Sequence, residues 1–120
     1  MIRGAHVIVY SRDPEADRAF IRDVLEWPYV DAHGGWLIFA QPPAELAFHP
    51  LDADAAERHE LYLMCDDIQA TMEQLAGRGT EFVAPVTETR FGLLTQIRLP
   101  GGSMLGLYEP RHASPLPAFS

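Results

Sequence analysis

The sequence predicts an α+β fold in which one β-α-β-β-β unit is used twice. Two stretches carry this prediction: residues 2–13, IRGAHVIVYSRD, and residues 58–67, RHELYLMCDD, follow the same plan. Each is an apolar, β-favouring run with one polar side chain, and each ends in an aspartate able to begin a helix. His6 and Glu60 occupy matching positions, 54 residues apart. A repeat of this length is typical of one supersecondary unit used twice.

Composition supports a single domain over residues 1–120. Apolar residues make up 48% of the chain and charged residues 22%, which is ordinary for a globular protein. The net charge of −8 argues against nucleic acid or an anionic membrane surface as a partner. No apolar run approaches the roughly 20 residues of a membrane helix, and the N-terminus does not resemble a signal peptide. Cys65 is the only cysteine, so we expect a cytoplasmic protein without an internal disulfide.

The first module is predicted over about residues 2–50. Its first strand spans residues 2–10, where alternation places His6, Ile8 and Tyr10 on one face. Asp13-Pro14 begins a helix that runs to about residue 25, because an aspartate cap and a proline in the first turn favour a helix start. The remaining predicted elements are a hairpin turning at residues 33–35, with its second strand at 36–40, and a strand at 45–49 that Pro50 ends.

Residues 51–57 are predicted to connect the modules, and the second module follows over about residues 58–110. Its predicted elements are a strand at 58–65, a helix from Asp67 to about Gly77, and strands at 81–83, 93–99 and 104–108. A loop at 84–91 and a turn at 100–103 join these strands. The tail, residues 111–120, has two prolines and no periodicity, and we expect it to be extended and weakly held.

A sheet with one helix leaves its second face uncovered, and two such modules can enclose a cavity. This layout resembles the vicinal oxygen chelate superfamily, which includes glyoxalase I, extradiol dioxygenases, fosfomycin-resistance enzymes and bleomycin-binding proteins. The resemblance lies in the first-strand His6, in FIRDVLEW, and in the closing PGGSMLGLYEP, and it covers about residues 2–110. It implies a curled mixed sheet around a cavity. It also implies a homodimer, because pairing of modules across chains is common in the family.

The resemblance also implies a metal site. His6 matches the family's first-strand histidine, Glu60 falls where a second histidine is usual, and Glu45 is the candidate fourth-strand glutamate. These donors suit one divalent ion, Zn²⁺, Fe²⁺, Mn²⁺ or Ni²⁺, and Glu45 or Glu60 would also serve as the proton-transfer base. Gly106, however, stands where the family carries its last metal-binding glutamate. Glu109 lies three residues further and should face the other side of the strand. A site without any metal is therefore equally compatible.

Ten residues are predicted to line the cavity, with or without a metal, because they share faces with the candidate ligands or lie on nearby loops. They are Ile8, Tyr10, Trp36, His49, Tyr62, Met64, Phe91, Met104, Gly106 and Tyr108. Aromatic and apolar walls with few polar groups are typical of small-molecule pockets. The same residues would equally suit the filled interior of a barrel.

Two functions follow. One is a metal-dependent lyase, isomerase or dioxygenase whose ion activates a substrate through two neighbouring oxygens. The other is a metal-free protein that sequesters a small molecule, such as an antibiotic, in an aromatic cleft. Retention of His6 and Glu60 favours the enzyme, and Gly106 favours the binding protein.

Overall fold

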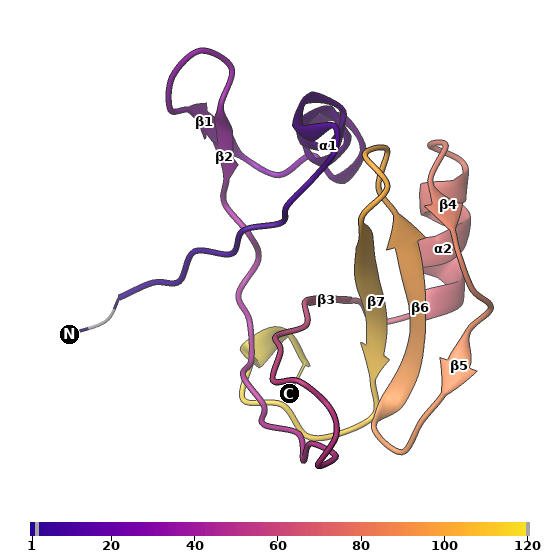
Figure 1. Ribbon diagram of the computed structural model, residues 1–120. Coiled ribbons are helices and arrows are strands. Elements are labelled where there is room, and N and C mark those ends of the chain that lie inside the picture. Colours follow the sequence, from indigo (N-terminus) through magenta and orange to yellow (C-terminus); the bar gives the residue numbers. More distant parts are fainter. Residues whose placement is uncertain (2, 120) are drawn as a thin grey trace.

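The computed structural model describes residues 1 and 3–119, so Ile2 of the predicted first strand and Ser120 of the tail lie outside it. Figure 1 shows a five-stranded sheet with α2 on one face, a smaller hairpin beside α1, and an extended N-terminal arm that leaves the body. The chain is thus an α+β protein, as predicted, and its strands form two separate sheets.

The second module forms the predicted β-α-β-β-β unit, with a shorter first strand than the predicted 58–65 and one additional short strand inside the predicted loop at 84–91. Its elements are β3 (Tyr62–Met64), α2 (Ile68–Ala76), β4 (Glu81–Phe82), β5 (Thr87–Glu88), β6 (Gly92–Arg98) and β7 (Met104–Pro110). The strand order is β3-β7-β6-β4, and β5 also pairs with β6. β3 runs parallel to β7, whereas the other pairs are antiparallel. The Asp67 carboxylate accepts a hydrogen bond from the Ala70 amide at 3.1 Å and begins α2 as predicted.

One hydrophobic core joins the two modules. Leu105 and Leu107 alternate along β7 and are buried, which places them on the face that α2 covers. Phe20 of α1 packs into the same cluster. The buried apolar residues are Phe20, Ile68, Leu75, Ile97, Leu99, Leu105 and Leu107.

A buried carboxylate reinforces the junction between the modules. Asp17 of α1 is 8% exposed, and its Oδ1 accepts a hydrogen bond from the Gly101 amide at 2.6 Å. Gly101 lies in the turn before β7, and a side chain there would collide with Ser11 and Asp17. The first-module helix is therefore fixed to the second module by contacts within one chain.

The first module forms its helix and hairpin as predicted. α1 (Pro14–Phe20) continues as a π-helical segment, η1 (Ile21–Leu25), and Glu26 ends it in the left-handed conformation with φ of 59°. Asp13 caps α1 by accepting from the Ala16 amide at 3.1 Å. β1 (Tyr29–Asp31) and β2 (Leu37–Phe39) pair antiparallel around a turn in which Gly34 and Gly35 have positive φ.

The predicted strands at 2–10 and 45–49 are not strands in this structure. Residues 3–10 form the arm that projects from the body in Figure 1, and neither they nor residues 45–49 pair with a strand within the described chain. In the second module the corresponding first and last strands, β3 and β7, pair with each other. A β-favouring sequence forms a strand only beside a neighbour, and these two segments lack one.

The connector and the tail complete the chain. Residues 51–57, the predicted connector, contain a turn closed by a hydrogen bond from the Ala55 amide to the Asp52 carbonyl. The tail differs from the extended form that the sequence predicts, because Pro117–Phe119 form a short 3-10 helix, η2, and His112 and Ser114 contact Glu45. Among the described residues, no helix has the length and apolarity needed to span a membrane.

Candidate functional site

The candidate site lies on the sheet face opposite α2. Because Leu105 and Leu107 point toward α2, the alternating residues Met104, Gly106 and Tyr108 belong to the other face. Tyr62 and Met64 of β3 share that face, since Leu61 and Leu63 pack against the core. Leu94, Gln96 and Arg98 of β6 lie opposite Tyr108, Gly106 and Met104 in the antiparallel ladder and complete it. The sequence places Glu60, Tyr62, Met64, Met104, Gly106 and Tyr108 on one face. In the structure the last five share it, and Glu60, before the start of β3, is hydrogen-bonded to Tyr62.

The space beside Gly106 is filled by an aromatic side chain. Tyr62 is its partner in the parallel ladder, and the Tyr62 ring lies across the glycine. A Cβ at position 106 would collide with that ring. The position where the sequence resemblance implies a metal-binding glutamate is therefore covered by an aromatic side chain of the neighbouring strand.

A continuous chain of side chains crosses this face from Glu60 to Glu45. The Tyr62 hydroxyl donates to Glu60 Oε2 at 2.9 Å, and the Tyr62 and Tyr108 rings lie tilted with centroids 6.1 Å apart. The His112 ring stacks on Tyr108 at a centroid distance of 5.8 Å and an interplanar angle of 28°. His112 Nε2 then lies 3.4 Å from Glu45 Oε1. Two predicted ligands and two predicted wall residues are thus connected through a histidine that the sequence analysis does not select.

The tail occupies both oxygens of the Glu45 carboxylate. The Ser114 hydroxyl donates to Oε2 at 2.7 Å, while His112 lies at Oε1. His112 Nδ1 lies 2.8 Å from the Ala113 carbonyl oxygen, within hydrogen-bonding distance. Because a carbonyl oxygen only accepts, Nδ1 carries a hydrogen. The Glu45 side chain is only 20% exposed and that of His112 28%.

Both tyrosines of the site remain hydrogen-bond donors at neutral pH. Burial raises the pKa of Tyr62, and the neighbouring Glu60 carboxylate raises it further. Burial also raises the pKa of Tyr108, with a smaller contribution from Glu45. Each phenol therefore keeps its proton and stays polarised toward an acceptor.

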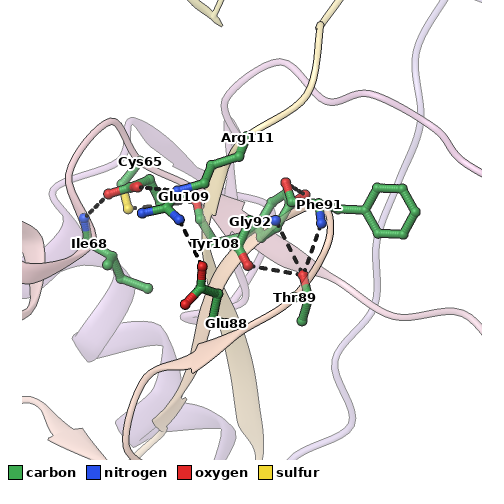
Figure 2. A network of polar contacts seen from close by, with 9 residues as sticks. All are labelled: Cys65, Ile68, Glu88, Thr89, Phe91, Gly92, Tyr108, Glu109 and Arg111. Atoms are coloured by element: carbon green, nitrogen blue, oxygen red, sulfur yellow. Dashed lines mark hydrogen bonds and ion pairs between the residues drawn. The ribbon is translucent and has the colours of Figure 1, made fainter.

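The loop at one end of the site is held tightly. Figure 2 shows the Tyr108 hydroxyl directed at the Phe91 carbonyl, to which it donates at 2.7 Å. The Arg111 amide donates to the same carbonyl at 2.7 Å, and the Thr89 hydroxyl accepts from the amides of Phe91 and Gly92. The Phe91 side chain, by contrast, points away from this network and is exposed.

Glu109 faces the α2 side of β7, as its position in the sequence predicts. One of its oxygens accepts from the Ile68 amide at 3.0 Å, and the other lies 3.6 Å from Arg111 Nε (Figure 2). Its carboxylate thus satisfies a free amide at the start of α2 and is not part of the candidate site.

The predicted metal ligands do not come together within one chain. His6 lies on the exposed arm, Glu60 is bonded to Tyr62 and lies 3.5 Å from Arg58, and Glu45 is held by the tail. Within residues 1 and 3–119, no group of three or more His, Cys, Asp or Glu side chains is arranged to hold a metal ion. A metal at these residues remains a prediction that requires donors from a second chain.

The predicted wall residues of the first module lie outside this cluster. Ile8 and Tyr10 are exposed on the arm, and His49 is exposed with its Nδ1 at 2.6 Å from the Pro50 carbonyl. Trp36 is exposed on the hairpin, where the Arg18 guanidinium lies 4.6 Å from its ring centroid. The second module therefore supplies most of the site that one chain forms.

His112 and Ser114 are the site residues that sequence reasoning missed. They lie in a tail without periodicity, and nothing in its pattern indicates contact with residue 45. The available signal is the imidazole itself, two residues after the end of the last strand of the sheet.

Comparison with known proteins places the fold. No protein-family model matches the chain, and no curated protein matches it either. Solved structures do match. A lactoylglutathione lyase from Agrobacterium tumefaciens has a TM-score of 0.63 and 16% identity over 89% of this chain and 92% of its own.

Two further structures match over similar lengths. TnmS3, an antibiotic-binding protein from Streptomyces sp. CB03234, has a TM-score of 0.56 and 23% identity, over 88% of this chain and 99% of its own. A glyoxalase/bleomycin resistance protein/dioxygenase from Nocardioides has a TM-score of 0.63 and 16% identity, over 97% and 90%. The chain therefore has the fold of the glyoxalase/bleomycin resistance protein/dioxygenase superfamily, as the resemblance in its sequence predicts.

Proposed function

We propose that this protein binds a small, flat, partly apolar molecule on the aromatic face of its second module and does so without a metal. The observation that carries this proposal is the position of the Tyr62 ring across Gly106, which replaces a metal-binding carboxylate with an aromatic wall. Tyr108 and Met104 extend the wall, and Gln96 and Arg98 offer polar groups beside it. The antibiotic-binding protein TnmS3 shares the fold and supports this class of function.

The test is a melting-temperature screen with planar aromatic compounds, performed with and without a chelator. A ligand at 100 times its Kd should stabilise the native state by about 2.7 kcal/mol, and the chelator should change nothing. Tyr108→Ala should remove the shift, whereas Tyr29→Ala on the distant hairpin should keep it. A panel in which no compound stabilises the protein would count against the proposal.

The second candidate is a metal-dependent enzyme of the glyoxalase or dioxygenase type. The exposed N-terminal arm favours this candidate, because it holds His6 away from the rest of the chain, where a second chain could contact it. His6, Glu45 and Glu60 would hold one Zn²⁺, Fe²⁺, Mn²⁺ or Ni²⁺ between two chains, and that ion would supply Lewis-acid activation. Elemental analysis of protein purified without chelator or tag metal separates the candidates, since only this one expects an ion that His6→Ala removes.

We also propose that the protein works as a homodimer in the cytoplasm. The arm and residues 45–49 carry exposed apolar side chains on backbone without a strand partner: Val7, Ile8, Val9, Tyr10, Leu46 and Phe48. A second copy of the chain offers matching segments and would remove this surface from water. The single free thiol, Cys65, suits a reducing compartment.

A further inference from the structure

Two side chains of the tail, His112 and Ser114, occupy the candidate site. A flat heteroaromatic ring, that of His112, stacks on Tyr108 and presents a nitrogen to Glu45 Oε1. The Ser114 hydroxyl donates to the second oxygen of the same carboxylate at 2.7 Å. The first module, the last strand and the tail thus meet around one carboxylate and one aromatic face.

These contacts show the chemistry that the site accepts. Tyr108 offers a ring face and Glu45 offers two acceptor oxygens, so the complementary group is a planar ring that carries N–H or O–H donors at its edge. A cationic ring would gain more, because the chain carries a net charge of −8 and the stacking partner is an electron-rich phenol.

The tail is also held in a way that allows it to move away from Glu45 and Tyr108. Its two side chains reach Glu45 from residues 112–119, none of which belongs to the buried hydrophobic core. The Ser114 hydroxyl also accepts from the Leu116 amide at 3.1 Å, a local turn that survives when Glu45 is released. Release would expose Glu45 and the Tyr108 face together, because one short segment covers both.

We infer that residues 112–119 form a displaceable strap that competes with ligand for Tyr108 and Glu45, and that the ligand is a planar, donor-bearing, cationic heteroaromatic compound. This inference rests on the proposed binding function and adds its ligand class and its internal competitor. Binding then requires the open state, so the apparent Kd exceeds the intrinsic Kd by the reciprocal of the open fraction.

The experiment titrates the full chain with proflavine, a fluorescent planar cation with ring amino groups. His112→Ala/Ser114→Ala removes both strap contacts, and we expect its affinity for proflavine to rise by about threefold or more over the wild type. His33→Ala, in the exposed hairpin turn, is the matched control and should leave the affinity unchanged. Equal affinity in the double variant and the wild type would overturn the strap.

A second change tests the ligand class in the unstrapped background. Glu45→Gln combined with His112→Ala/Ser114→Ala should lower the proflavine affinity by about tenfold, since it removes the anionic acceptor. No loss would overturn the role of Glu45. In the wild type, the His112 ring-proton resonances should leave their stacked positions as proflavine is added, and resonances that stay fixed at saturation would also overturn displacement.

The outcomes separate this inference from the proposed function. If proflavine binds no variant while another planar compound stabilises the protein through Tyr108, the ligand class is wrong and the binding function stands. If no planar compound stabilises either the wild type or the unstrapped variant, the binding function itself fails.

Discussion

At the scale of single residues, Gly106 decides the shape of the site, because a hydrogen in place of a side chain lets the Tyr62 ring lie across β7. Gly106→Ala should destabilise the protein by about 1–3 kcal/mol, since the new Cβ must displace that ring. Urea denaturation measures the change. Gly106→Glu should be at least as costly and should bring no gain in Mn²⁺ affinity.

Gly4→Ala is the matched control for position 106. A Cβ at Gly4 meets no atom within 4 Å, so the change should stay within about 0.5 kcal/mol. A folded Gly106→Glu variant with higher Mn²⁺ affinity would show that Tyr62 swings aside and that the slot is open.

The raised pKa of Tyr62 predicts a loss of stability at alkaline pH. The folded chain holds this phenolic proton more tightly than the unfolded chain does, so the unfolded state binds fewer protons once the pH exceeds about 10. The stabilisation is complete below that pH and is lost as the pH rises through the higher folded pKa. Tyr62→Phe should therefore flatten the alkaline limb of the stability curve, measured by urea denaturation at each pH. If the substitution leaves the alkaline part of the stability curve unchanged, the loss of stability at high pH arises from other groups.

At the scale of elements, the start of α2 depends on a carboxylate from a distant strand. Glu109 of β7 accepts from the Ile68 amide and places a negative charge at the positive end of the helix. Glu109→Ala should cost about 1–2 kcal/mol in the free energy of unfolding. Glu73→Ala, exposed in the middle of α2, should be nearly neutral, and equal effects of the two changes would contradict this role.

Elements with local signals were predictable from the sequence, and those that need a distant partner were not. Asp13 and Asp67 mark both helix starts, and β6 and β7 are apolar runs that flank a glycine-rich turn. Residues 3–10 have the composition of a strand but no strand partner among the residues that the structure describes, so they remain an arm. Alternation along the predicted strand places Gly106 on the face of the site. Only the folded structure shows that the Tyr62 ring fills the space beside it.

At the scale of the whole molecule, the unpaired segments of the first module predict the assembly. We expect a dimer at micromolar concentration in sedimentation, and Ile8→Asp should make it monomeric by placing a charge in the apolar contact. Val30→Asp on the hairpin is a fair control, because Val30 is 65% exposed and Ile8 64%. A wild type that sediments as a monomer would contradict the assembly and leave the fold unaffected.

The Asp17–Gly101 hydrogen bond and the shared core have a consequence for the order of folding events. Because both join α1 to the sheet within one chain, a single molecule can complete its interior before it meets another. The rate of that step does not depend on protein concentration, whereas arm docking between chains is second order. Newly made chains at low concentration would thus persist as folded monomers with free arms, and each arm would move from Tyr10, whose carbonyl accepts a hydrogen bond from the Ser103 hydroxyl at 2.9 Å.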